Sequence, residues 1–189
     1  MKNLINSSLK SHAEALNLID EKKIHHASDL ILQSLSGNNT IFWCGNGGSA
    51  SQANHLSAEL IGGMYKDKKS PFKSVCLNVD TAFITAWSND DSFNNIFTRQ
   101  LEGLAQSDDI LIALSTSGNS KNIINAANYA KANNIKTFSL TGNNGGKLKK
   151  ESNLNININS SSTQRIQEAH ILIGHMICDV IELSVQEKA

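Results

Sequence analysis

Residues 109–120, DILIALSTSGNS, contain the clearest buried strand of the chain and, directly after it, a loop of hydroxyl side chains. An unbroken apolar run is typical of a strand that is covered on both faces, as in a parallel sheet. Residues 119–133 then show the apolar spacing of a helix. The stretch therefore predicts a strand, a loop and a helix, the repeating unit of α/β proteins.

The same unit recurs on both sides of this stretch. We expect strands at residues 40–44, 74–77, 109–114, 135–140 and 153–159, and helices at residues 5–36, 49–64, 81–88, 92–105, 119–133 and 162–187. Strands that alternate with helices predict parallel pairing through crossover helices. We therefore expect one α/β domain over residues 1–189, with a doubly wound, five-stranded parallel sheet in flavodoxin-like order. Its core would span residues 40–160, between an N-terminal helix (5–36) and a C-terminal helix (162–187).

The composition excludes several classes of protein. Of the 189 residues, 40% are hydrophobic and 18% are charged, and 17 basic residues balance 17 acidic ones. These values fit a globular chain and not a disordered one. A net charge of zero argues against a dedicated binder of nucleic acid or anionic membranes, because such binding needs a positive field. No apolar run approaches the ~18 residues of a transmembrane helix.

The cysteines and the N-terminal residues bear on the compartment. Cys44, Cys76 and Cys178 are widely spaced and form no CxxC pattern, which favours reduced, packed thiols. The first residues lack the apolar core of a signal peptide. We therefore expect a cytoplasmic protein.

Two loops follow predicted strands that should be neighbours in the sheet. Residues 45–50, GNGGSA, lead into a helix, where glycines let backbone N–H groups approach an anion. A tight turn without a ligand and a dinucleotide fingerprint stay open, although no acidic residue ends a strand about 20 residues on. Residues 115–120, STSGNS, open the next helix and predict a phosphate cradle, or otherwise an N-cap with surplus serines.

Histidines and carboxylates with helical spacing are candidates for chemistry. His55 and Glu59 share one helix face, where they can be a surface contact or two metal ligands. His175 lies in an apolar helix, where a core histidine is the default interpretation if the residue is taken alone. The remaining histidines, His12, His25, His26 and His170, show no partner pattern, so we expect them to be structural.

Six motifs in this order, GNGGSA, HLSAEL, SND (88–90), STSGNS, LTG (140–142) and RIQEAHILIGH (165–175), resemble the phosphoheptose isomerase family of the SIS domain superfamily. The resemblance covers residues 40–183. It implies a homotetramer of single α/β domains, with sites at subunit interfaces and one zinc ion per subunit. The implied activity converts sedoheptulose 7-phosphate to D-glycero-D-manno-heptose 7-phosphate through an enediol. This is the first step of activated heptose synthesis for lipopolysaccharide, capsule or other surface glycans.

The resemblance also assigns roles to individual residues. The sugar would contact Asn46, Gly47, Gly48, Asn89 and Asp90, together with Glu59 and Gln167. The phosphate would contact Ser115, Thr116, Ser117 and Ser120. Zinc would be held by His55, Glu59, Gln167 and His175, and Glu59 with His175 would be the acid–base pair. The chain departs from the family at residues 61–64, IGGM, where the usual pattern is Gly-Arg-aromatic.

Other functions remain as alternatives within the same superfamily. A non-catalytic protein that binds a sugar phosphate and associates with the replication initiator has similar glycine and RIQ motifs. It lacks the acidic residue at position 59 and the histidine at position 175, and both are present here. A sugar-phosphate sensor, or an isomerase of another ketose phosphate, is the third possibility.

The spacing of two expected zinc ligands raises a geometric problem. Gln167 and His175 lie on one predicted helix, and eight residues of helix rise ~12 Å. One ion can hardly reach both side chains, because zinc ligands lie only ~2 Å from the metal. Either the helix breaks near Gln167 or the two ligands come from different chains. We expect the active site to span subunits, with Glu59 and His175 also contributed by different chains.

Overall fold

The computed structural model describes residues 2–65 and 71–186, and it contains one five-stranded sheet in which every strand pair is parallel. The strands are β1 (Ile41–Gly45), β2 (Ser74–Cys76), β3 (Ile110–Ser115), β4 (Lys136–Gly142) and β5 (Leu154–Ile158). Their spatial order is β2-β1-β3-β4-β5. This confirms the doubly wound sheet and its flavodoxin-like order.

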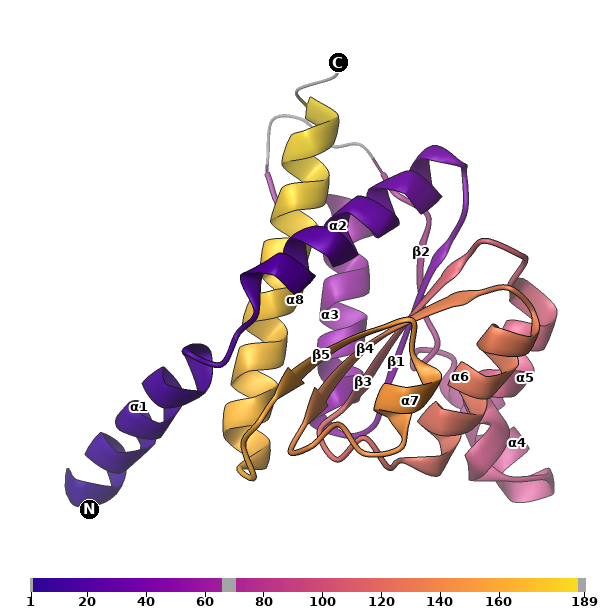
Figure 1. The fold of residues 1–189 in the computed structure, drawn as a ribbon. Helices are drawn as coiled ribbons and strands as arrows, with labels where there is room; N and C mark the ends of the chain where they lie inside the picture. The colour runs from indigo at the N-terminus through magenta and orange to yellow at the C-terminus, as the bar shows by residue number, and fades with distance from the viewer. Residues whose placement is uncertain (1, 66–70, 187–189) are drawn as a thin grey trace.

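Helices cover both faces of the sheet (Figure 1). They are α1 (Lys2–Leu16), α2 (Glu21–Ser36), α3 (Gly48–Gly62), α4 (Thr81–Asp90), α5 (Ile96–Leu104), α6 (Lys121–Ala132), α7 (Leu148–Glu151) and α8 (Thr163–Gln186), with a 3₁₀ turn at Phe93–Asn95. The strands alternate between two cores. On β1, Trp43 packs into the core under α2, α3 and α8, while Phe42 packs into the core under α5 and α6.

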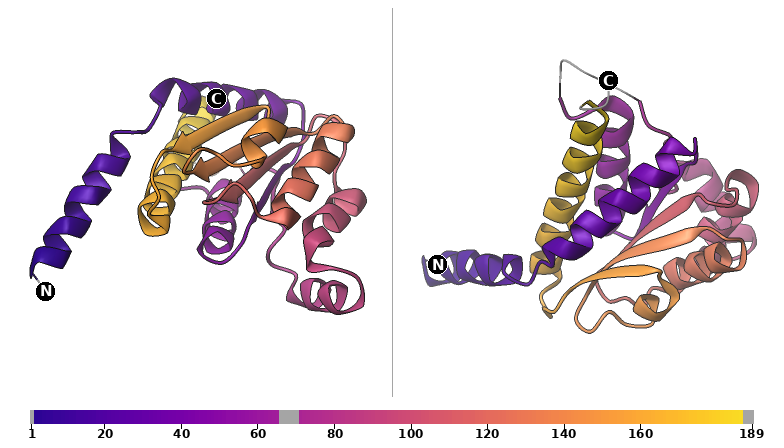
Figure 2. Two further views of the ribbon diagram at one scale, coloured as in Figure 1. Left: turned by 60° about the horizontal axis from the view of Figure 1, so that its bottom comes forward. Right: turned by 45° about the horizontal axis from the view of Figure 1, so that its top comes forward.

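The predicted helix over residues 5–36 is wrong as a single element. It is divided into α1 and α2. Asp20 has an extended backbone, and its side chain accepts from Lys23 N as the N-cap of α2. Figures 1 and 2 show α1 leaving the body of the domain, and its Leu4, Ile5 and Leu9 are exposed.

The other elements match their predicted ranges within a few residues, and α7 was not expected. The predicted C-terminal helix extended to residue 187, which lies outside the described residues. No helix within residues 2–65 and 71–186 combines the length and the apolarity needed to cross a bilayer.

The three cysteines are free and buried, as expected. Burial raises the pKa of each thiol, that of Cys178 to about 12. These thiols therefore pack as small apolar groups and stay protonated at neutral pH.

Candidate metal centre and active site

Three potential metal ligands from two helices converge on one point. His55 and Glu59 lie one turn apart on α3, and His175 faces them from α8. One ligand atom of each lies within 4.8 Å of the other two. The Nε2 atoms of His55 and His175 are 2.8 Å apart, and Glu59 Oε1 is 3.4 Å from His55 Nε2. We call these three residues the metal trio.

The trio can form because α3 and α8 approach closely at Gly174. A Cβ atom at this position would lie 2.6 Å from Leu56 Cδ2 on α3. An alanine at this crossing would therefore require the Leu56 side chain or one of the two helices to shift. Since His175 and His55 are the direct neighbours of Gly174 and Leu56, the close approach brings the two imidazoles together.

The donor set of the trio fits a zinc ion. Two imidazole nitrogens and one carboxylate oxygen are ligand types that zinc prefers, and a site with three protein ligands leaves one position open. Without a cation, one imidazole must donate an Nε2–H to the Nε2 of the other for the two rings to lie at this distance. The structure therefore supports the metal interpretation of His55 and Glu59, and His175 is not a core histidine because it is part of the trio.

Gln167 lies away from the trio in this chain. Its side chain packs over Gly48, where a Cβ would lie 2.6 Å from Gln167 Nε2. Helix α8 continues from Thr163 to Gln186, so the alternative of a helix break is wrong. The axial rise of ~12 Å between Gln167 and His175 therefore remains. Glu59 and His175, in contrast, meet within one chain, which corrects the expectation that they come from different chains.

Asn78 hydrogen-bonds to the start of the glycine loop, residues 45–48 at the end of β1. Asn78 Oδ1 accepts from Gly45 N and Asn78 Nδ2 donates to Gly45 O. Gly47 has a φ of 56°, a left-handed conformation that favours glycine. These features place Asn46, Gly47 and Gly48 at the N-terminus of α3, the end of a helix that favours an anion.

The hydroxyl loop, residues 115–120 at the end of β3, lies at the N-terminus of α6. Ser115 Oγ donates to Ser120 Oγ over 3.2 Å, and Ser120, the N-cap residue of α6, makes no side-chain cap. Of the first three N–H groups of α6, that of Ile123 donates to Asn122 Oδ1, so those of Lys121 and Asn122 are available to a ligand together with the loop hydroxyls. Because β1 and β3 are paired neighbours, this loop and the glycine loop share one edge of the sheet.

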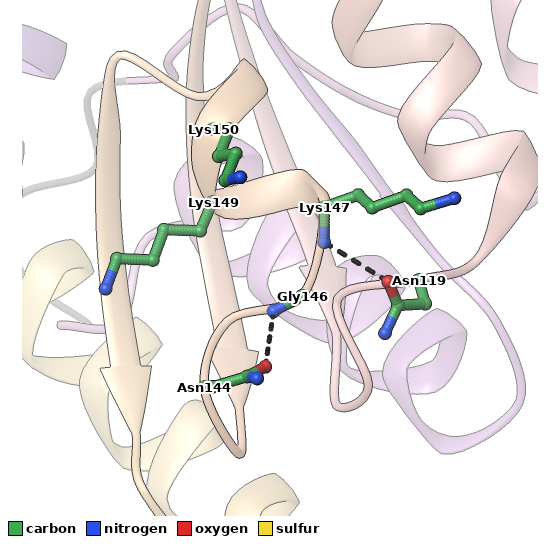
Figure 3. A pocket seen from close by; sticks show the side chains of 6 residues that line it. All are labelled: Asn119, Asn144, Gly146, Lys147, Lys149 and Lys150. Carbon is green, nitrogen blue, oxygen red and sulfur yellow. Dashed lines mark hydrogen bonds between the residues drawn. The ribbon is translucent and has the colours of Figure 1, made fainter.

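A second glycine-rich loop, residues 142–146 after β4, supports the hydroxyl loop. Gly118 has a φ of 63°, and a Cβ there would lie 2.9 Å from Gly146 N. Asn119 Oδ1 accepts from Lys147 N, as Figure 3 shows. The adjoining pocket of about 640 Å³ is lined by Asn119, Asn144, Gly146, Lys147, Lys149 and Lys150. The three lysine side chains point in different directions (Figure 3), so they do not converge on one ligand.

Asn89 and Asp90, which were predicted to contact the sugar, lie at the end of α4. Both are exposed, and Asn89 Nδ2 donates to Asp90 Oδ1. No hydrogen bond among the described residues joins them to either loop or to the trio. The departure at residues 61–64 ends α3, because Gly63 has a φ of 78° and its N–H donates to Glu59 O.

Two of the histidines that show no partner pattern in the sequence, His12 and His170, make contacts between distant parts of the chain. His12 Nδ1 lies 2.7 Å from Glu168 Oε2, which links α1 to α8. His170 is buried and its Nε2 donates to Thr141 O. Both contacts join residues far apart in sequence, so no local pattern signals them. They are structural contacts, in keeping with the role that was expected.

Comparison with known proteins identifies the family. A family model described as SIS domain matches residues 6–142. A phosphoheptose isomerase from Sulfurimonas denitrificans is 44% identical over 190 residues, with 98% of this chain and 97% of the relative covered. Two solved structures, each with 96% of both chains covered, have the same fold. Phosphoheptose isomerase GmhA from Neisseria gonorrhoeae matches with a TM-score of 0.87 and 35% identity, and a phosphoheptose isomerase from Francisella tularensis with 0.89 and 32%.

The phosphoheptose isomerase relative and the two solved structures match nearly the whole chain, and they confirm the resemblance that the six motifs indicated. High identity, the shared fold and the family model agree with one another. The chain therefore belongs to the SIS domain family and, within it, to the phosphoheptose isomerases.

Proposed function

We propose that this protein isomerises sedoheptulose 7-phosphate to D-glycero-D-manno-heptose 7-phosphate, the first step of activated heptose synthesis for surface glycans. The observation that carries the proposal is the metal trio, in a chain that also has two loops suited to an anion at the carboxyl ends of the paired strands β1 and β3. The trio includes the two residues, Glu59 and His175, that the non-catalytic replication-associated relatives lack. An enzyme is therefore favoured over a binding protein.

The reaction needs acid–base chemistry and no redox cofactor. A base removes the C1 proton of the ketose, an enediol forms, and a proton is returned to C2 while the hydroxyl proton moves from O1 to O2. In our proposal Glu59 and His175 are the acid–base pair, and both lie at one end of the substrate. The hydroxyl loop, Ser115, Thr116, Ser117 and Ser120, would hold the phosphate at the other end. Asn46, Gly47, Gly48, Gln167, Asn89 and Asp90 would contact the sugar.

We further propose that His55, Glu59, Gln167 and His175 hold one zinc ion per subunit. The ion would polarise the oxygens at C1 and C2 and fix their orientation. Gln167 supplies an amide oxygen, an unusual ligand for zinc, and its position over Gly48 suggests that it reaches the ion of a neighbouring subunit.

We also propose a homotetramer with its sites at subunit interfaces. Helix α1 projects from the domain with exposed Leu4, Ile5 and Leu9, and Val79 and Phe93 on either side of α4 are exposed as well. Exposed apolar surface of this kind is typical of protein–protein contacts. The three free cysteines agree with a cytoplasmic location, where thiols stay reduced.

The direct test incubates the purified, zinc-loaded protein with sedoheptulose 7-phosphate in deuterium oxide and follows the sugar by NMR. We expect the aldose product, with solvent deuterium at C2 because the base exchanges its proton with water. Fructose 6-phosphate and unphosphorylated sedoheptulose serve as controls and should react far more slowly. Failure to form any aldose from sedoheptulose 7-phosphate would refute the proposal, and turnover of the six-carbon substrate alone would assign a different sugar.

A further inference from the structure

An asparagine outside the six sequence motifs joins the two ligand loops. Asn122 lies in the first turn of α6, two residues after the hydroxyl loop, and it is only 2% exposed. Its Nδ2 donates to Asn46 Oδ1 over 2.9 Å, and its Oδ1 accepts from Asn46 Nδ2 over 2.8 Å. The two amides therefore form a reciprocal pair that connects α6 with the glycine loop.

The orientation of the Asn122 amide is determined from the protein side. Its Oδ1 also accepts from Ile123 N over 3.0 Å, which distinguishes the oxygen from the nitrogen. In turn, the pair determines how the half-buried Asn46 presents its own amide. An asparagine side chain has two N–H groups and two acceptor lone pairs. The pair uses one of each, so one N–H and one lone pair of Asn46 remain for a ligand.

The Asn46–Asn122 pair lies at the carboxyl ends of two neighbouring strands. Asn46 follows β1 and Asn122 follows β3 by a few residues, and these strands are paired in the sheet. From the other side, Asn78 binds both backbone polar groups of Gly45, the residue before Asn46. Asn46 is therefore held between two asparagines, one that fixes its backbone and one that fixes its side chain. Such fixing lowers the entropy that a ligand-binding side chain loses on binding.

We propose that Asn122 is a positioning residue for the isomerase reaction. It does not touch the substrate, but it orients the Asn46 amide so that the free N–H and lone pair meet adjacent hydroxyl groups of the sugar. This inference rests on the proposed function, which places Asn46 against the sugar. It assigns Asn122 to recognition of the sugar and not to recognition of the phosphate.

The test is a double-mutant cycle between Asn46→Ala and Asn122→Ala, read as KM and kcat with sedoheptulose 7-phosphate. We expect Asn122→Ala to raise KM roughly 10- to 100-fold, the effect of losing one or two hydrogen bonds. We expect kcat to change little, because the sugar contact is made in the ground state and the transition state alike. In the Asn46→Ala background, Asn122→Ala should raise KM no further.

Inorganic phosphate, used as a competitive inhibitor, separates positioning from general damage. We expect its inhibition constant to be unchanged in Asn122→Ala, because the amide pair faces the sugar. An equal rise in KM and in the inhibition constant would show that Asn122 merely shapes the hydroxyl loop. An undiminished effect of Asn122→Ala in the Asn46→Ala background would equally overturn the inference.

Asn125→Ala provides the matched control. Asn125 lies one turn further along α6, and its side chain donates to Asn94 O and Asn95 Oδ1, away from both ligand loops. It should lower the melting temperature without changing KM. Because Asn122 is buried, Asn122→Ser is made as well. Its hydroxyl can still accept from Ile123 N but is too short to reach Asn46, so a folded Asn122→Ser with wild-type KM would also overturn the inference.

The wild-type measurement keeps the two proposals apart. An inactive wild type refutes the isomerase function itself. An active wild type with additive mutations refutes only the role of Asn122.

Discussion

Gly174 on α8 lies against Leu56 on α3 with no room for a Cβ atom between them, since that atom would lie 2.6 Å from Leu56 Cδ2. The contact sets the distance between the two helices that carry the metal trio. Packed interiors transmit such steric changes because they contain few voids that can absorb them. The geometry of the metal centre therefore depends on a residue that binds nothing.

We expect Gly174→Ala to weaken zinc binding roughly 10- to 100-fold, the range found when groups that orient metal ligands are changed. The added methyl group must displace either the Leu56 side chain or α8. We expect α8 to move away from α3, and His175 from His55, because Leu56 is fully buried and has little space to move into. A competition titration with a chromogenic zinc chelator measures the affinity. Gly103→Ala is the control, because Gly103 also lies in a helix but has nothing within 4 Å of an added Cβ. It should keep wild-type affinity, and equal losses in both variants would contradict this account.

The sheet could be predicted from the sequence because each strand is a short run with β-forming or alternating side chains between loops. The break between α1 and α2 could not, because apolar residues keep helical spacing through it and only Asp20 marks it. The site shows the same division. His55 and Glu59 are neighbours by helical periodicity alone, whereas their contact with His175 depends on how α8 packs against α3.

The asparagines were beyond the reach of sequence reasoning for a different reason. Asparagine is frequent throughout this chain, so Asn78 and Asn122 did not stand out from the background. Their hydrogen bonds reach across 33 and 76 positions. Only the pairing of parallel strands brings such distant residues together.

Glu59→Gln should lower kcat by at least roughly 10²- to 10⁴-fold, the usual contribution of a general base. The change keeps the size of the side chain but removes its basicity. Circular dichroism should show an intact fold. Glu102→Gln is the control, because Glu102 is an exposed carboxylate that pairs with Arg99, and it should keep full activity. Near wild-type turnover in Glu59→Gln would remove Glu59 from the mechanism. His175→Gln should behave likewise, and a variant that is merely destabilised would contradict its catalytic role.

Ser117→Ala combined with Ser120→Ala should weaken binding of the phosphorylated substrate. A hydrogen bond to a charged group contributes about 1.5–3 kcal/mol, so we expect a loss of roughly 10-fold or more in affinity. Isothermal calorimetry measures the affinity for sedoheptulose 7-phosphate and the affinity for unphosphorylated sedoheptulose. Only the affinity for the phosphorylated sugar should weaken. Ser36→Ala, at an exposed serine at the end of α2, serves as control. Equal losses for both sugars would mean that the loop does not recognise phosphate.

His170 should make the fold sensitive to mild acid. Burial lowers the pKa of His170 to about 4, against a weaker opposing effect of its hydrogen bond to Thr141 O. In the unfolded chain the imidazole of His170 binds a proton below about pH 6.5, whereas in the folded chain it stays neutral down to about pH 4. The contribution of His170 to the free energy of unfolding is therefore fully present above about pH 6.5 and is lost as the pH falls toward 4. The full loss is on the order of 3 kcal/mol.

Thermal unfolding of wild type and His170→Gln between pH 7.5 and 4.5 tests this, within the window in which the histidine pKa values differ. Both proteins lose stability as carboxylates protonate, so the difference between them isolates His170. We expect the wild type to lose more stability than the variant as the pH falls. Parallel pH profiles would show that His170 is not the titrating group.

Subunit mixing tests which chain supplies Gln167. The trio lies within one chain and Gln167 is two helical turns away from it, so we expect Gln167 to complete the site of a neighbour. Inactive Gln167→Ala and inactive Glu59→Gln proteins are combined under conditions that exchange subunits. Sites that take the intact trio from one variant and the intact Gln167 from the other should regain activity. A parallel mixture of Glu59→Gln with His175→Gln should stay inactive, because each of those chains lacks a member of its own trio. Recovery in this second mixture, or none in the first although mass spectrometry detects mixed oligomers, would mean that the ligands are shared between chains in another way.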